Sequence, residues 1–361
     1  MTTEATPAAQ EDAARASSLV GPFKGYHNET YVLRLPGEKS GQGKPWCWKF
    51  KEPRDSILWF DRRCFDSEEQ LLEALAGRVT WIPEVKKEDG FRLQRFVEGR
   101  TLGASVPRGS ALPEALIDQI ITLFREMARI APRMLTVKRR CAEQYRASEG
   151  DTNQFLEVLI RFTERDVYLA NRPRFGGLFA ELGIGQESFE ALRARMSRMV
   201  SRPFCLLHGD LHRENFIVDP QGQLWTIDWE LAMVGDPLYD LATHLHLMGY
   251  APEQANEVTR RWSLTVEEVL PGSSVGYKED LDSLLDYKRA QSVFTDVIRT
   301  AQMLDTATDQ EGESLGRAAG KVHGVLTAAV DALGLGAPPS HERVEAALER
   351  WLQRQGRAPR S

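Results

Sequence analysis

Residues 205–241 read CLLHGDLHRENFIVDPQGQLWTIDWELAMVGDPLYDL, and this stretch decides how the rest of the chain is interpreted. Three short apolar runs, typical of buried strands, are separated first by a polar loop and then by a turn. The loop, 208–215, contains Asp210 and Asn215, and the third apolar run ends on Asp228. We expect the chemistry of the protein where these polar side chains follow the strands.

The three polar residues have a spacing with chemical meaning. Asp210 and Asn215 form the pattern D-x-x-x-x-N, which is the spacing of a kinase catalytic loop. There the carboxylate accepts the proton of an attacking hydroxyl, and the amide oxygen binds Mg²⁺. Asp228 suits a second ligand for Mg²⁺ that bridges nucleotide phosphates, because hard cations prefer oxygen ligands. The spacing therefore predicts phosphoryl transfer.

Two other interpretations of the loop compete with this one. His208 and His212, with Asp210 between them, could form a transition-metal site, although all three fall on one short loop. The loop could also carry ordinary polar turn residues. Asp228 and the following GDPLYDLA fit the catalytic interpretation as one constellation. We expect His208 to brace the loop through the backbone, and His212 either to brace it or to contact the acceptor.

The composition argues against two classes of protein, general nucleic-acid binders and membrane-spanning proteins. The chain has 361 residues, 42% of them hydrophobic and 27% charged, and a net charge of −6. The missing basic excess argues against a general nucleic-acid partner, and no apolar run is long enough for a membrane span. Residues 1–18 lack the apolar core of a signal peptide and are expected to be disordered. Four scattered cysteines are expected to be reduced thiols of a cytoplasmic protein: Cys47, Cys64, Cys141 and Cys205.

The pattern of residues 19–100 predicts a small sheet with one helix, which would form an N-terminal lobe. The predicted helix is 66–76, where Asp66 or Ser67 can cap it. Two strands around a turn are predicted over 19–35, single strands over 45–51 and 91–97, and a loop over 37–44. In 45–51, Lys49 and Lys51 share a face opposite the aromatic side chains. That face is either solvated or functional.

Residues 101–355 are expected to form a mostly helical C-terminal lobe into which 205–241 is inserted, followed by a tail at 356–361. Helical periodicity is clearest in 111–131 and 286–304. Weaker helical segments are 153–170, 186–200, 240–249, 253–262, 313–333 and 340–354.

The motifs HGDLHRENF, IDWE and GDPLYDLA resemble the aminoglycoside phosphotransferase / choline kinase superfamily, the small-molecule branch of the protein-kinase-like fold. The resemblance covers roughly residues 20–350 and is specific at 206–242. It implies a bilobal α+β fold. It also implies that Asp210 is the catalytic base, that Asn215 and Asp228 bind Mg²⁺, and that Asp240 braces the catalytic loop from the following helix.

The same resemblance assigns roles in the first lobe. Lys49 stands where kinases have the lysine of V-A-I-K, so it is the first choice for binding the α- and β-phosphates, with Lys51 as runner-up. Glu68 would be its partner on the helix, with Glu69 or Glu73 as alternatives.

Two further nucleotide contacts are implied. Residues 93–97, which include Gln94 and Phe96, would be the hinge whose backbone meets adenine. Residues 21–30 would be the hairpin that covers the phosphates, although they depart from G-x-G-x-x-G. Only six residues separate Asp228 from Gly235, which leaves no room for a long activation segment. That argues against a signalling kinase regulated by such a segment, but not against a peptide acceptor.

We therefore expect a phosphotransferase that uses ATP and Mg²⁺ and acts on a hydroxyl of a small molecule such as an antibiotic or natural product. The segments GYHNETYVL and WTIDWELAMVGDPLYDLATHL resemble phosphotransferases of actinobacterial natural-product pathways. Two alternatives stay open: a Ser/Thr kinase of a ribosomal precursor peptide, as in lanthipeptide dehydration, and a nucleotide-binding pseudokinase scaffold. A polycationic acceptor would need acidic residues in the helical lobe, and the candidates are Asp280, Asp282, Asp286 and Asp296. The oligomeric state is left open.

Overall fold

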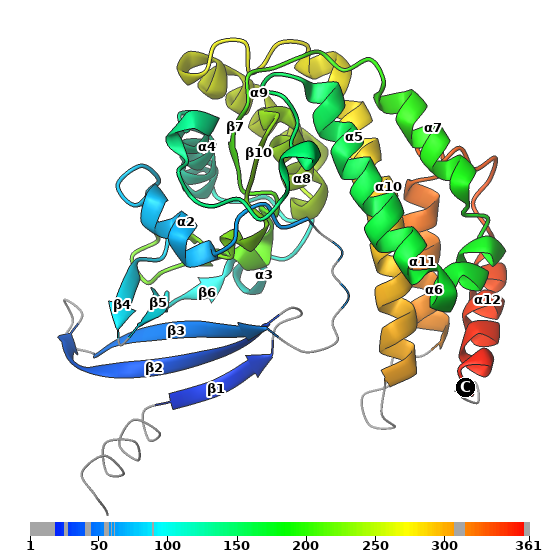
Figure 1. The fold of residues 1–361 in the computed structure, drawn as a ribbon, viewed down its shortest axis with the longest axis horizontal. Coiled ribbons are helices and arrows are strands. Elements are labelled where there is room, and N and C mark those ends of the chain that lie inside the picture. Colours follow the sequence, from blue (N-terminus) through cyan, green and yellow to red (C-terminus); the bar gives the residue numbers. More distant parts are fainter. Residues whose placement is uncertain are drawn as a thin grey trace, which may run out of the picture.

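The computed structural model describes residues 19–24, 28–39, 45–53, 58, 60, 62–88, 90–306 and 315–356. Residues 1–18, which are expected to be disordered, and all of the 356–361 tail except its first residue lie outside the described residues. The described chain forms a small, mainly β-sheet part at one side and a larger helical part (Figure 1). Within the described residues, no helix is long and apolar enough to cross a membrane.

The N-terminal sheet has five antiparallel strands. Their order is β1-β2-β3-β5-β4, and their bounds are β1 Leu19–Lys24, β2 Asn28–Lys39, β3 Pro45–Pro53, β4 Val85–Glu88 and β5 Phe91–Arg95. The strand β2 continues to Lys39, so the prediction of a loop over 37–44 was wrong for residues 37–39. In the sheet register Lys51 pairs with Thr30, and Lys49 pairs with Val32 on one side and Gln94 on the other.

The helix of this lobe, α2 (Glu68–Leu75), begins as its sequence predicts. The side chain of Ser67 caps it by accepting a hydrogen bond from the amide of Gln70 at 3.2 Å. Its apolar side, Leu71, Leu72 and Leu75, is buried. Burial of that stripe fixes the rotation of the helix, so the acidic first turn that begins with Glu68 faces the junction with the second lobe.

The stretch that opened the sequence analysis builds two small sheets rather than one. Strand β7 (Cys205–Leu207) pairs with β10 (Met233–Gly235), while β8 (Phe216–Val218) lies between β6 (Arg100–Thr101) and β9 (Leu224–Thr226). The loop 208–215 therefore passes from one sheet to the other. Its two ends are held by separate hydrogen-bonded ladders.

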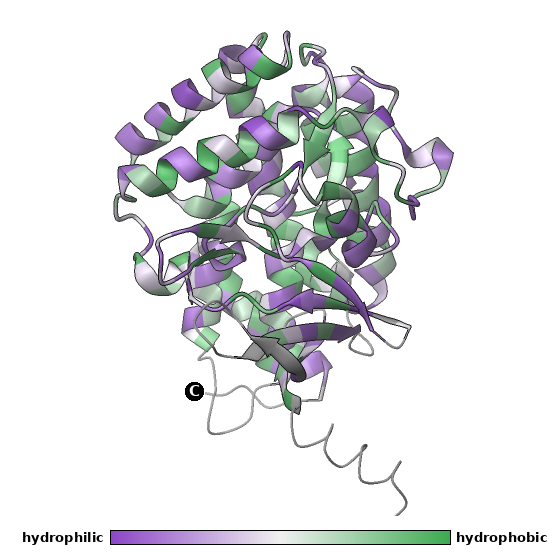
Figure 2. Ribbon diagram, turned by 90° about the vertical axis from the view of Figure 1, so that its left-hand side faces the viewer, coloured by the Kyte–Doolittle hydropathy of each residue, from purple (hydrophilic) through white to green (hydrophobic). Residues whose placement is uncertain are grey.

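Helices form the remainder of the second lobe, and hydrophobic and hydrophilic residues alternate along them, as expected for helices with one buried side (Figure 2). The long helix α10 (Tyr277–Thr306) packs against α8, α11 and α7. The other helices are α3 Leu102–Ser105, α4 Glu114–Ala128, α5 Thr152–Phe162, α6 Ala170–Glu181, α7 Gln186–Met196, α8 Pro237–Met248, α9 Pro252–Val269, α11 Leu315–Ala328 and α12 His341–Arg354. A π-helical segment, Thr163–Leu169, joins α5 to α6.

A buried ionic cluster ties the start of α8 to α10. The guanidinium of Arg202 is inaccessible to solvent and pairs with Asp236 at 2.9 Å and with Asp280. Asp280 also accepts a hydrogen bond from the amide of Val200 at 2.9 Å. The cluster fixes the position of α8. Asp280 therefore has a structural role, and it is not free to contact the substrate that accepts the phosphate. The predicted architecture, an antiparallel sheet with one helix followed by a mostly helical lobe, is confirmed.

Candidate active site

Helix α8 holds the backbone of the loop 208–215 through Asp240. One oxygen of Asp240 accepts the amide hydrogen of His208 at 3.0 Å, and the other accepts that of Gly209 at 2.8 Å. Burial raises the pKa of Asp240 to about 6, although these two hydrogen bonds act in the opposite direction. Gly209 has a φ of +82°, and a Cβ there would lie 2.7 Å from the carbonyl oxygen of Leu231. The position therefore requires glycine.

His208 also contributes to the loop as a brace. Its Nε2 donates to the carbonyl of Ile227 at 3.1 Å, and its Nδ1 accepts from the amide of Asp210 at 3.3 Å. The ring packs on Trp229 with centroids 4.6 Å apart, and burial lowers the pKa of His208. Because both ring nitrogens are engaged, His208 is not available as a metal ligand. Across the described part of the chain, no group of three or more His, Cys, Asp and Glu residues is placed to hold a metal.

Asp210 is oriented by two neighbours. Asn215 Nδ2 donates to the backbone oxygen of Asp210 at 2.9 Å and to its Oδ2 at 3.1 Å, and His212 Nε2 lies 3.3 Å from the same Oδ2. Burial alone would lower the pKa of His212, but the hydrogen bond and charge of Asp210 raise it overall. Because its amide nitrogen faces Asp210, the amide oxygen of Asn215 is the atom left for a metal.

Asp228 lies at the junction of the two lobes. It adopts the left-handed backbone conformation, with φ 64° and ψ 60°, which is uncommon for a residue with a side chain and is concentrated at functional sites. Its Oδ1 is 2.7 Å from Lys51 Nζ, which is also 2.9 Å from Glu68 Oε2. Burial acts to raise the pKa of Asp228, but the charge and hydrogen bond of Lys51 together with the charge of Lys49 outweigh it, and the pKa is lowered. The other oxygen of Glu68 accepts the amide hydrogen of Trp229 at 2.9 Å.

The lysine in this arrangement is Lys51, the runner-up, and not Lys49. Lys49 is 9% exposed, and burial together with the charge of Lys51 lowers its pKa. Lys51 lines the interlobe cavity and joins Glu68 to Asp228. The two lysines share a face of β3, so the alternation of the strand could not separate them. The position of α2 against the strand decides between them.

The expected hinge is already hydrogen-bonded within the protein. The side chain of Gln94 is 1% exposed and donates to Glu69 at 3.1 Å. The amide of Phe96 donates to the carbonyl of Cys47 at 2.8 Å, and that of Arg95 donates to Glu84 at 2.8 Å. The backbone N–H groups of Arg95 and Phe96 are therefore not free for adenine, and neither Gln94 nor Phe96 lines the cavity.

The predicted hairpin reaches across to the second lobe. Asn28 Nδ2 donates to Glu230 Oε2 at 2.9 Å, and Arg63 pairs with the same oxygen at 2.7 Å. Asn28 and Thr30 line the cavity, while the turn at residues 25–27 lies outside the described residues.

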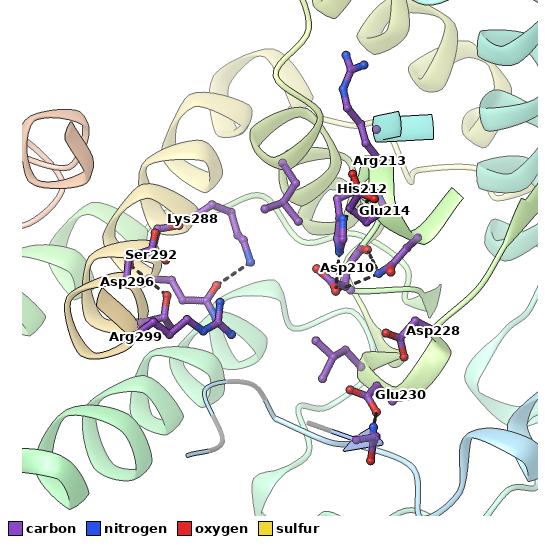
Figure 3. A pocket seen from close by; sticks show the side chains of 18 of the residues that line it. Asp210, His212, Arg213, Glu214, Asp228, Glu230, Lys288, Ser292, Asp296 and Arg299 are labelled. Atoms are coloured by element: carbon purple, nitrogen blue, oxygen red, sulfur yellow. Dashed lines mark hydrogen bonds and ion pairs between the residues drawn. The ribbon is translucent and has the colours of Figure 1, made fainter. Parts of the chain in front are cut away.

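A cavity of about 720 Å³ lies between the lobes. Asp210, His212, Asp228 and Glu230 stand on one side of it, and α10 forms the facing wall (Figure 3). Of the polar residues of that wall, the sequence analysis named Asp296 as a candidate but missed Lys288, Ser292 and Arg299. Their spacing along α10, opposite the apolar stripe of that helix, is the signal that could have revealed them.

Residues 21–271 match the Phosphotransferase enzyme family (APH). The match covers well over half of the chain, and the chain belongs to this family. The class of enzyme predicted from the catalytic-loop motifs, a phosphotransferase, is thereby confirmed.

Comparison with solved structures gives the same fold. Choline kinase LicA from Streptococcus pneumoniae is 16% identical, with 91% of this chain and 98% of that chain covered and a TM-score of 0.50. Macrolide 2'-phosphotransferase MphH from Brachybacterium faecium is 14% identical, with 93% and 100% covered and a TM-score of 0.47. At 16% identity the likeness to the choline kinase extends to the fold alone. No curated protein sequence matches the chain.

Proposed function

We propose that the chain transfers the γ-phosphate of ATP, with Mg²⁺, to a hydroxyl group of a small molecule. The observation that carries the proposal is the convergence of Asp210, Asn215, Asp228 and Lys51 on one cavity. These residue types are the ones that phosphoryl transfer to an alcohol requires. The cavity volume also falls in the range of about 300–1,000 Å³ that is usual for small-molecule sites.

Each residue has a role that follows from its contacts. Asp210, oriented by Asn215 and His212, accepts the proton of the attacking hydroxyl. The donor set for the metal, the Asn215 amide oxygen and the Asp228 carboxylate, consists of the oxygen ligands that suit Mg²⁺. Bound Mg²⁺ would supply neutralisation of the phosphate charge. Asp240 and His208 hold the loop so that Asp210 needs no rearrangement before the reaction.

Lys51 is proposed as the phosphate-binding cation. Its contacts with Glu68 and Asp228 fix its ammonium group at the edge of the cavity. A cation held between two carboxylates is positioned before the nucleotide arrives, which lowers the entropy lost on binding.

The two alternatives make different demands on the site. A pseudokinase scaffold does not require a proton acceptor, so the oriented Asp210 supports an active enzyme. A Ser/Thr-containing peptide stays an alternative acceptor, and it would have to enter the space between Asp210 and α10. The volume of the cavity, about 720 Å³, supports a small molecule instead.

The test is a screen for phosphorylated products by mass spectrometry with ATP and Mg²⁺. The acceptor panel contains aminoglycosides, nucleoside antibiotics, choline-like alcohols and Ser-rich peptides. We expect Asp210→Ala to abolish turnover and to keep ATP binding, while Asp282→Asn, an exposed position on α10, behaves like the wild type. Activity of Asp210→Ala close to that of the wild type would refute the mechanism. Modification of peptides alone would replace the small-molecule acceptor by the peptide alternative.

A further inference from the structure

The wall of the cavity opposite Asp210 contains a buried cation that forms no ion pair, although its charge acts on the buried carboxylate of Asp240. Lys288 is 7% exposed and its side chain points from α10 toward Asp210 across the cavity (Figure 3). Its Nζ lies 2.6 Å from Gln291 Oε1, 3.4 Å from the hydroxyl of Tyr239 and 5.2 Å from the centroid of that ring. All of these partners are neutral. Among the described residues, no carboxylate lies within ion-pair distance of Lys288.

A buried lysine is normally paired with a carboxylate, because removing a charge from water is costly. The same cost applies to a buried carboxylate, and on α10 the buried Asp286 is paired, with Arg289 and Arg195. Lys288 departs from the rule at the point where the helix borders the cavity. An anion that enters the cavity would complete the pair.

A second cation reinforces this part of the wall. Arg299 points into the same cavity, and its guanidinium stacks over Phe60, 4.7 Å from the ring centroid (Figure 3). Nearby His246 stays neutral because burial, and then the charges of Lys288, Arg289 and Arg108, lower its pKa to about 4. Lys288 and Arg299 thus bring two cations to this end of the cavity, where Asp296 is the one carboxylate of the α10 wall among the described residues.

The acidic residues expected for a polycationic acceptor are mostly engaged elsewhere. Asp280 and Asp286 pair with arginines, and Asp282 does not line the cavity. Only Asp296 of the four lies in the wall, and burial raises its pKa, opposed by the charges of Lys321 and Arg299. One such carboxylate is a poor match for several ammonium groups.

We propose that the acceptor of this enzyme is a hydroxyl compound that also carries an acid group, a carboxylate or a phosphate, and that Lys288 and Arg299 bind this group while the hydroxyl faces Asp210. The inference rests on the proposed function and adds the class of substrate to it. The catalytic side, with its carboxylates, is suited to the metal, and the α10 wall is suited to the anionic end of the acceptor.

The test measures anion binding without turnover. Inorganic phosphate and glycerate are titrated calorimetrically into the protein in buffer free of nucleotide and Mg²⁺, with glyceramide as the uncharged counterpart of glycerate. The variants are Lys288→Met, Lys51→Met on the nucleotide side, and Lys278→Met, an exposed position on α10, as the matched control. The melting temperature of each variant without anion establishes that it is folded.

We expect saturable anion binding by the wild type, Lys278→Met and Lys51→Met, and at least about tenfold weaker binding by Lys288→Met, since one lost charge contact at about 1.4 kcal/mol corresponds to a factor of ten. Glyceramide should not bind. The tighter of the two anions identifies the acid group as phosphate or carboxylate. Equal binding by Lys288→Met, loss in Lys51→Met instead, or no saturable binding by the wild type would overturn the inference.

A turnover arm separates this inference from the proposed function. Hydroxy acids and their primary amides are offered in matched pairs with ATP and Mg²⁺, beside a polycationic aminoglycoside. We expect the acids to be the better acceptors and the preference to disappear in Lys288→Met. Lys288-dependent anion binding without any phosphorylated product would refute the proposed function and keep the anion site. Phosphorylation of the aminoglycoside with equal efficiency by the wild type and Lys288→Met would keep the function and refute the anionic acceptor.

Discussion

Replacing Asp240 by Asn tests how the catalytic loop is held. The carboxylate accepts one amide hydrogen on each oxygen, from His208 at 3.0 Å and Gly209 at 2.8 Å. An Asn side chain has one acceptor oxygen, so its NH₂ group would face the second N–H. One buried donor then loses its partner, which costs about 1–3 kcal/mol. The donors lie within two residues of Asp210, so the loop should shift there.

Asp240→Asn also has a stabilising effect, because the wild type loses stability when the buried Asp240 carboxyl ionises and the variant does not. Burial raises its pKa from the ordinary 3.8 to about 6, so the folded protein holds a proton that the unfolded chain releases between these two values. The stability of the wild type therefore falls as pH rises from about 4 to about 6, by about 3 kcal/mol in all. Asp240→Asn lacks this term. Its stability relative to the wild type should improve by about that amount between pH 4 and pH 7.

Activity should respond differently from stability. At pH 7.5 we expect the free energy of unfolding of Asp240→Asn to lie within about 2 kcal/mol of the wild-type value, because the two effects nearly cancel. We expect kcat to fall by about 100-fold, the effect of a displacement of about 1 Å in the reacting groups, with ATP affinity nearly unchanged. Urea denaturation across pH and steady-state kinetics measure these quantities, with Asp282→Asn as the matched exposed control. A stability difference that stays constant with pH, or an unchanged kcat, would refute the reasoning.

Three more predictions follow from single contacts. Lys51→Met should weaken nucleotide binding about tenfold or more, whereas Lys49→Met should change it little; calorimetry showing the reverse would restore the original choice. Arg202→Met should destabilise the fold by about 3–5 kcal/mol in urea, because two buried aspartates lose their cation, and a loss below about 1 kcal/mol would contradict this. The hydrogen bond from Cys64, together with two neighbouring arginines, lowers the pKa of Cys141 to about 5. Iodoacetamide should therefore label Cys141 nearly as fast at about pH 6.5 as at about pH 8.5, and a rate that rises steeply between them would count against the lowered pKa.

The fold could be predicted wherever the information is local. The cap at Ser67 and the apolar stripe of α2 are read directly from consecutive residues, and the structure places that helix at Glu68–Leu75. Strand pairing could not be predicted in this way, because the sequence of an apolar strand does not show which other strand it pairs with. The sequence shows Cys205–Leu207 followed by Phe216–Val218, yet these strands belong to different sheets. That division is what leaves the catalytic loop held at both ends.

The residues of the candidate site also fall into those that the local sequence predicts and those that depend on tertiary packing. Asp210, Asn215 and Asp228 lie on one short stretch, so their spacing alone indicated that they act together. The choice between Lys49 and Lys51 depends on how α2 sits against β3, which is a tertiary property. Lys288 lies further along the chain, and only the packing of α10 brings it to the cavity. Its charge and helical position were visible in the sequence, but the direction of its side chain was not.

The ion pair between Lys51 and Asp228 is compatible with a metal at Asp228. A carboxylate that is to bind a cation must be ionised, and burial at the lobe junction works against ionisation. Lys51, whose Nζ is 2.7 Å from Asp228 Oδ1, acts to keep the pKa of Asp228 low before a metal or nucleotide binds. Glu68 holds the same lysine from the other side at 2.9 Å, so Lys51 stays in place if Asp228 exchanges it for a metal. Lys51 would then be left beside Glu68 with its remaining donor hydrogens directed at the cavity, which is the position that a phosphate-binding cation requires.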